Sequence, residues 1–168
     1  MAAITRAQFL GADWSDRKRA IRPPWALAEQ NFVERCNRCG ECIPACPTGI
    51  LSKGRGGFPQ VGFTAGECTF CGKCVEACKP AALVRSGNCA PWEIVARIGE
   101  SCLAFERVVC RSCGERCEQG AIRFRPALGG VSRPELNSQG CNGCGACVRV
   151  CPASAISMHA PVDEEVAA

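Results

Sequence analysis

The sequence predicts an α+β fold of two tandem modules, in which short hairpins and short helices surround cysteine-lined sites. Three observations lead to this prediction. The chain has 17 cysteines among 168 residues, a content typical of a disulfide scaffold or of a metal protein. Most of these cysteines recur at one fixed spacing. Glycine-rich turns between short apolar segments lie between the recurrences, as they do in hairpins.

The first cysteine run, residues 36–47, has the spacing C-x2-C-x2-C-x3-C-P, which is typical of bacterial [4Fe–4S] ligand runs. Three thiolates this close together reach successive irons of one cluster. The fourth lies beyond a short helical turn and points to another cluster. The same spacing returns at residues 68–78 and 141–151. The sequence therefore predicts bacterial-type 2[4Fe-4S] ferredoxin-like modules.

Disulfides and zinc are the two alternative uses of so many cysteines. The number of cysteines is odd, their spacing repeats, and no apolar signal segment leads the chain, all of which disfavour a secreted disulfide framework. Zinc ribbons also contain C-x2-C pairs. Three thiolates within seven residues, followed by a fourth after three more, suit a cluster better than one tetrahedral ion.

The charge and the apolar content argue against two kinds of partner, nucleic acid and the membrane interior. The formal net charge is +4 when cysteines are counted as neutral, but four clusters with thiolate ligands would bring it to about −4. The basic balance is therefore no evidence for nucleic-acid binding. No apolar run approaches the roughly 18 residues of a membrane span. Residues 5–10 faintly resemble a twin-arginine signal but have one arginine only, so we expect a cytoplasmic protein with reduced thiols.

Residues 1–31 contain no cysteine and form a basic leader. Pro23 and Pro24 favour an extended path, and Trp14 and Trp25 lie near arginines and lysines. Such a leader is either a flexible segment, as chain ends often are, or an arm that docks a partner protein through aromatic anchors. A segment folded back over the modules would have the same pattern.

Residues 32–88 are predicted to form the first module, with two clusters. After the first run, an apolar pair at residues 50–51, a glycine-rich turn at 54–57 and an alternating segment at 58–63 predict a hairpin. The second run follows at once. A short apolar segment at residues 82–84 closes the module.

Residues 89–158 are predicted to form the second module, whose first run lacks its leading cysteine. The sequence before Cys102 is similar to that before Cys68, with an acidic residue shortly ahead of the cysteine. We therefore interpret Cys102 as the displaced first ligand and residues 103–109 as an inserted loop. Cys89 precedes a predicted strand, where no other run has a ligand, so Cys89 is the spare cysteine. The reverse assignment remains an alternative.

The rest of the second module repeats the plan of the first. Residues 92–98 alternate as in a strand, although a short helix is also compatible. Residues 121–124 and 131–136 predict a second hairpin, and residues 155–158 a closing strand. Residues 159–168 form an acidic tail, expected to be disordered. His159, the single histidine, is taken as a solvated tail residue because a Rieske-type role needs a pair.

Because the fourth cysteine of each run crosses to the partner run, sixteen of the 17 cysteines are assigned to four [4Fe-4S] clusters. The predicted ligand sets are Cys36, Cys39, Cys42 and Cys78 for the first cluster; Cys68, Cys71, Cys74 and Cys46 for the second; Cys102, Cys110, Cys113 and Cys151 for the third; and Cys141, Cys144, Cys147 and Cys117 for the fourth. Cys89 is not a ligand. We expect the third site to be labile, or to hold a [3Fe-4S] form, and the apo form to be largely unfolded.

The sequence offers no catalytic machinery beside these runs. It has no Ser/His/Asp set, no phosphate-binding loop and no paired-carboxylate pocket. Irons with complete thiolate ligation have no open position for substrate, which favours electron carriage to a redox partner protein over catalysis. We therefore expect a protein that is not an enzyme.

Several segments outside the cysteine runs resemble the NapF family, ferredoxin-type proteins of the periplasmic nitrate reductase system. They are residues 21–25, 102–104 ahead of 110–113, 122–126, and 136–139 ahead of 141–147. The resemblance implies a cytoplasmic iron–sulfur accessory protein that contacts the nitrate reductase catalytic subunit before export and assists its cofactor maturation or redox state. The alternatives are a general low-potential electron carrier and an electron-relay subunit of a larger redox complex.

Overall fold

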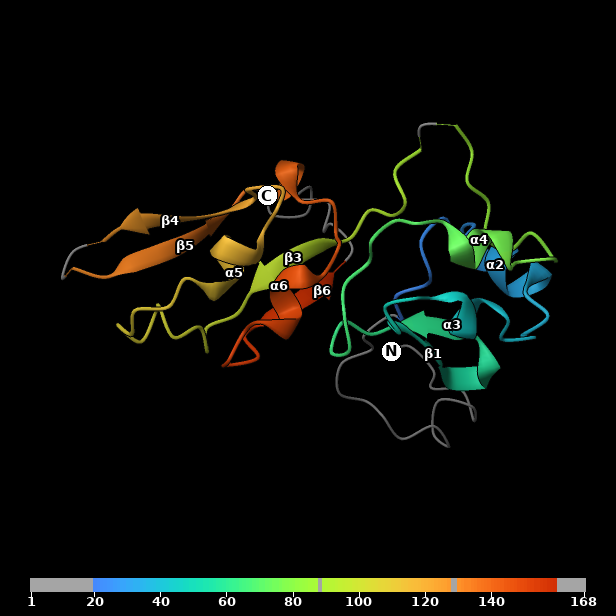
Figure 1. The fold of residues 1–168 in the computed structure, drawn as a ribbon, viewed down its shortest axis with the longest axis horizontal. Helices are drawn as coiled ribbons and strands as arrows, with labels where there is room; N and C mark the ends of the chain where they lie inside the picture. Colours follow the sequence, from blue (N-terminus) through green and yellow to red (C-terminus); the bar gives the residue numbers. More distant parts are fainter. Residues whose placement is uncertain (1–19, 88, 128–129, 160–168) are drawn as a thin grey trace, which may run out of the picture.

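The computed structural model describes residues 20–87, 89–127 and 130–159, which form two lobes side by side (Figure 1). The first lobe is coloured blue to green and the second yellow-green to red. Among the described residues, the strands form three sheets of two strands each. Small lobes of short strands and short helices agree with the predicted α+β class.

The first lobe contains the hairpin that its glycine-rich turn predicts. Strands β1 (Leu51–Lys53) and β2 (Pro59–Val61) pair in antiparallel fashion. The connection is a short 3-10 turn in which Gly56 and Gly57 have φ values of 65° and 82°. Glycine adopts this left-handed backbone without the clash of a Cβ atom, which is why the turn forms here.

Each cysteine run ends in a short helix, as the spacing predicts. These helices are α3 (Cys42–Ala45), α4 (Lys73–Glu76), α5 (Ser112–Arg116) and α6 (Ala146–Arg149). Helices α3 and α4 pack together in the first lobe, and α5 and α6 pack together in the second. Each helix therefore carries a cysteine toward its partner run.

The second lobe contains two antiparallel strand pairs. Strand β3 (Val95–Ile98) pairs with β6 (Ile156–His159), and β4 (Ile122–Pro126) pairs with β5 (Ser132–Leu136). The β3 segment is thus a strand rather than a short helix. His159 differs from its expected place in a solvated tail, because it pairs with Val95 at the end of β6 and its Nε2 lies 2.8 Å from Ser157 Oγ.

Residues 20–31 pack against the first lobe, as in the alternative of a segment folded back over the modules. The amide of Val61 donates to the carbonyl of Ile21 over 2.8 Å, and Ala26 forms an antiparallel bridge with Leu83. Helix α2 (Glu29–Arg35) follows and buries Phe32 completely. The bridge joins the beginning of the lobe to its end, as β3 and β6 do in the second lobe. Residues 1–19 lie outside the described residues.

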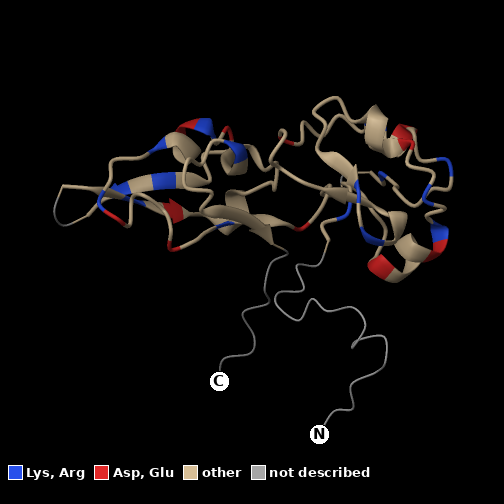
Figure 2. Cartoon of the chain, turned by 90° about the horizontal axis from the view of Figure 1, so that it is seen from below, with Lys and Arg blue, Asp and Glu red and all other residues tan. Residues whose placement is uncertain are grey.

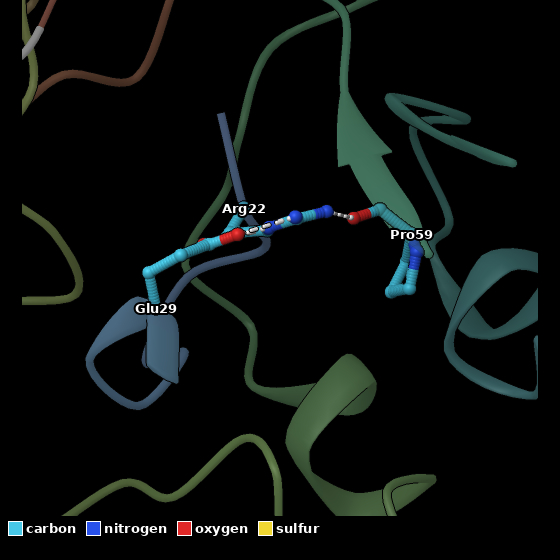
Figure 3. Close-up of polar contacts among 3 residues, drawn as sticks. All are labelled: Arg22, Glu29 and Pro59. Carbon is cyan, nitrogen blue, oxygen red and sulfur yellow. Dashed lines mark hydrogen bonds and ion pairs between the residues drawn. The ribbon is translucent and has the colours of Figure 1, made fainter. Parts of the chain in front are cut away.

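Arg22 holds this segment against the hairpin, as Figure 3 shows. Its Nε and Nη2 donate to the two carboxylate oxygens of Glu29 over 3.0 and 2.6 Å, and its Nη1 donates to the carbonyl of Pro59 over 3.4 Å. The guanidinium also lies 5.0 and 5.2 Å from the ring centroids of Phe32 and Phe58. A planar guanidinium can make the forked ion pair and the ring contacts together.

The apolar cores are small and include the cysteines. In the first lobe Phe32, Ile50, Leu51 and Phe63 are buried together with Cys42 and Cys74, and the second lobe has a similar cluster around Cys113 and Cys147. Basic and acidic residues are interspersed over both lobes (Figure 2). No helix in the described part of the chain is long and apolar enough to cross a membrane.

Candidate metal-cluster sites

Three hollows in the structure are each lined by four cysteines, and these are the predicted sets for the first three clusters. The first hollow has Cys36, Cys39, Cys42 and Cys78 in its lining, the second has Cys46, Cys68, Cys71 and Cys74, and the third has Cys102, Cys110, Cys113 and Cys151. In each, three cysteines come from one run and the other comes from the partner run. The packed helix pairs bring the two runs together.

The fourth set is brought together around Cys144 and Cys147. Burial raises the pKa of the Cys144 thiol, and the nearby thiols of Cys117 and Cys141 add to this increase. Burial likewise raises the pKa of Cys147 to about 12, with further contributions from Cys141 and Cys144. Such mutual effects need short distances, so the predicted members of this set are neighbours.

The third hollow is lined by Cys102 and not by Cys89. Cys102 is buried, at 8% exposure, and burial followed by the thiols of Cys102 and Cys110 raises the pKa of Cys113 to about 11. Cys89 is exposed and lines none of the three hollows. The predicted loop at residues 103–109 contains turns and no strand or helix, and Val109 directly before Cys110 is 80% exposed.

The electrostatics of the thiols favour a positively charged occupant. Burial and then neighbouring cysteines raise the pKa of Cys42 and Cys74 to about 11. Burial, partly offset by an amide hydrogen bond from Phe70, raises the pKa of Cys68 to about 11 as well. Gathered thiolates repel one another in a dry site, and the irons of a cluster would neutralise them.

Cys46 is the exception among these thiols. Its burial alone would raise the pKa, but hydrogen bonds from the Thr48 side chain and from the amides of Thr48, Gly49 and Ile50 outweigh burial and lower it. The Thr48 hydroxyl lies 3.5 Å from Cys46 Sγ. These donors directly follow the helix α3 and face the thiol that the first run contributes to the second hollow.

Hydrogen bonds shape the runs themselves, and sequence reasoning missed the residues that make them. The side-chain oxygen of Asn37 accepts from the amide of Cys39 over 3.2 Å, and that of Asn142 accepts from the amide of Cys144 over 3.1 Å. Both asparagines directly follow the first cysteine of their run. Asparagine at the same position in two repeats is the signal that could have indicated these turns.

The cysteines of the first three sets line hollows and do not form a compact group. Within the described residues, no three side chains of the metal-binding types lie close enough together to hold one metal ion. Four sulfur donors around a space are what a [4Fe–4S] cluster requires.

The second and fourth sites adjoin where the lobes meet. The amide of Cys68 donates to the carbonyl of Cys144 over 2.8 Å, which links a run of the first lobe directly to a run of the second. Arg116 forms an ion pair with Glu67 at the same place. The first and second sites lie in the first lobe, and the third and fourth sites lie in the second lobe. Along the molecule the four sites therefore follow the order first, second, fourth, third.

Aromatic residues pack this junction between the lobes. The ring of Trp92 lies 5.9 Å from that of Phe63 and 6.0 Å from that of Phe70, and its Nε1 donates to the carbonyl of Asn142 over 3.2 Å. Gly145 faces Phe63 so closely that a Cβ atom there would collide with the ring. The lobes are therefore held in a fixed relation by packing as well as by hydrogen bonds.

Comparison with known proteins identifies the same cysteine-rich segments. The domain family described as "4Fe-4S dicluster domain" matches residues 35–82 and 106–159. The second match begins after Cys102, so the displaced cysteine lies outside it. Each match covers one of the two lobes in large part.

Several similar curated proteins carry ferredoxin-type names. The ferredoxin-type protein NapF of Escherichia coli (strain K12) is 46% identical, over 91% of this chain and 93% of the relative. The ferredoxin-type protein NapF of Haemophilus influenzae is 51% identical, over 83% of this chain and 78% of the relative. The ferredoxin-type protein NapG of Escherichia coli (strain K12) is 29% identical, over 78% and 65% respectively.

Proposed function

This chain belongs to the NapF family of ferredoxin-type iron–sulfur proteins, and on that premise we propose that it carries electrons through four [4Fe-4S] clusters. The proposed ligands are the four sets of cysteines given above, with Cys102 completing the third set and Cys89 outside all of them. Each cluster, when bound, takes up or releases one electron. The single observation that carries the proposal is the gathering of each set of four thiols, three of them around a hollow.

The arrangement of the sites supports transport over catalysis. A set of four thiols leaves an iron–sulfur cluster no open position for a substrate. The contact between Cys68 and Cys144 joins the two lobes at ligand residues, so an electron entering one lobe has a short covalent and hydrogen-bonded route to the other. The protein in this proposal is a carrier and not an enzyme.

The specific partner in this proposal is the catalytic subunit of the periplasmic nitrate reductase, met in the cytoplasm before export. The family resemblance supports this partner. The insertion at residues 103–109 supports a role in delivery to a bound protein, because it places two exposed apolar side chains beside Cys110: Val108 and Val109 are 47% and 80% exposed. A partner protein bound at these valines would lie next to a ligand of the third site, from which it could receive electrons or a whole cluster.

Anaerobic mixing with the unexported catalytic subunit tests the proposal and separates its two forms. The carrier is loaded with clusters of ⁵⁷Fe, reduced, mixed with the subunit and then removed by affinity capture. Mössbauer signal in the subunit indicates cluster delivery, whereas reduction of the subunit's own centres without ⁵⁷Fe transfer indicates electron delivery. A complex that forms with neither change contradicts both.

A general electron carrier is the second candidate. The mixture of basic and acidic residues along both lobes (Figure 2) favours it, because a carrier with several partners does not need one lobe of a single charge sign. Such a carrier reduces several unrelated acceptor proteins at similar rates. The delivery role instead predicts that electron transfer to the nitrate reductase subunit is at least tenfold faster than electron transfer to unrelated acceptor proteins.

A further inference from the structure

Trp25 combines several features that its packing alone does not explain. Its backbone has a φ of 59°, in the left-handed region that bulky residues rarely adopt. The conformation is fixed from both sides, because its amide donates to the carbonyl of Pro91 and its carbonyl accepts from the amide of Val84. The guanidinium of Arg85 lies 5.1 Å from its ring. Backbone strain held this firmly is common at functional sites.

The indole N–H of Trp25 is buried and has no hydrogen-bond partner. Within the part of the chain that the structure describes, Nε1 of Trp25 is the single buried side-chain nitrogen or oxygen in this state, and the residue is only 7% exposed. A buried donor without an acceptor is costly, and tryptophan N–H groups in proteins usually find one. The indole N–H therefore has room in its interactions for a hydrogen-bond acceptor that is not part of the described chain.

The surroundings of Trp25 indicate what that acceptor is. Trp25 is one of the residues that line the hollow of the second site, together with Pro24 and the four cysteines of that set. The first and third hollows have no tryptophan in their linings. The chemical groups that would fill the second hollow are sulfide and thiolate sulfurs, and both accept hydrogen bonds from N–H donors.

We propose that Trp25 is a tuning residue of the second site, and that its indole N–H donates a hydrogen bond to a sulfur of the cluster held there. The inference rests on the proposed function, because it needs a cluster at that site. On reduction the cluster gains one electron and its sulfurs become more negative. A donor at a sulfur therefore stabilises the reduced form more than the oxidised form and raises the reduction potential.

Direct spectroscopy of the holoprotein is the first test. The protein is produced with ¹⁵N-labelled indole, reduced anaerobically, and studied by electron spin echo methods that detect nitrogen coupled to the cluster spin. We expect an indole nitrogen coupling at one cluster, which Trp25→Phe removes. The matched control is Trp92→Phe, since the Trp92 N–H already has the carbonyl of Asn142 as its acceptor; this variant should retain the coupling.

The potential gives a second, independent readout. Trp25→Phe retains an apolar ring but lacks the donor, so one cluster should become harder to reduce, with its reduced-to-oxidised ratio at a fixed poise falling roughly three- to tenfold. Full iron with an unchanged potential and no indole coupling in the unsubstituted protein overturns the inference while leaving the carrier function intact. If Trp25→Phe loses a cluster, the coupling in the unsubstituted protein still decides. Absence of iron–sulfur clusters from the protein would overturn the proposed function itself.

Discussion

Separate substitutions of Cys102 and Cys89 test which of the two cysteines is a cluster ligand. Cys102 is 8% exposed and lines the third hollow, whereas Cys89 is exposed. We predict that Cys102→Ser loses about four irons or converts the third cluster to a three-iron form, because a serine hydroxyl is a poor substitute for a thiolate. Cys89→Ser is the control and should retain all iron. Iron analysis with electron paramagnetic resonance measures both, and the opposite pattern would mean that the ligand assignment is reversed.

A second prediction for a single residue concerns the contribution of Arg22 to stability. Arg22→Lys keeps the positive charge but cannot make the fork to Glu29 and the contact with Pro59 together. We expect the holoprotein to lose about 1–2 kcal/mol of stability, seen as a lower urea midpoint in visible absorbance under anaerobic conditions.

The control for Arg22 is Lys79→Gln. The Lys79–Glu41 pair is 3.4 Å long, and its side chains are 81% and 45% exposed. Exposed pairs of this kind contribute little, so the midpoint should hardly move. Equal effects of the two substitutions would show that Arg22 acts only as an exposed charge.

At the scale of elements, Trp92 joins the lobes through its rings and its N–H. We predict that Trp92→Ala retains full iron content but loosens the junction, because the contacts with Phe63, Phe70 and Asn142 are lost together. Spin–spin broadening between clusters of different lobes should decrease in the fully reduced protein, and the exposed residues 84–87 and 89–90 should be cut faster by protease. Unchanged spectra would show that the Cys68–Cys144 contact holds the lobes without Trp92.

The elements that could be predicted are those encoded by neighbouring residues. The hairpin β1–β2 follows from its glycine turn, and the four short helices follow from the spacing of the cysteines. Helix α2 and the bridge from Ala26 to Leu83 could not be predicted, because they depend on contacts between distant parts of the chain. Trp25 could not be identified as a left-handed residue either, since glycine and asparagine are the usual signals of positive φ.

The site was more predictable than the fold around it. Three hollows are lined by the expected sets of cysteines. The spacing within a run and the short helix before its fourth cysteine can both be read from neighbouring residues, and together they predict which cysteines share a site. The lobe junction was not foreseen. It depends on Gly143 and Gly145, which look like ordinary spacing residues in the sequence but have left-handed backbones. Gly143 lies against Trp92 and Ile94, and Gly145 lies against Phe63 of the first lobe.

For the whole molecule, the iron is predicted to be part of the fold. Holoprotein purified without oxygen should contain about 16 irons per chain. The apolar cores are small and include buried thiols, so removal of iron by a chelator should unfold both lobes. Far-ultraviolet circular dichroism and small-angle scattering measure the loss, and iron with sulfide should restore the signal. A compact apo-protein would show that the cores are sufficient without metal.

The bridge between Ala26 and Leu83 has a consequence for the order in which the protein assembles. The chain leaves the ribosome from its N-terminus, so residues 20–28 emerge long before Leu83 and Pro91, to which they bind. Contacts between such distant positions form late. When the four cysteines of the second site have left the ribosome, Trp25 is therefore not yet fixed in its place beside that site. A nascent chain that ends before Pro91 lacks one of the two backbone hydrogen bonds that hold Trp25 there.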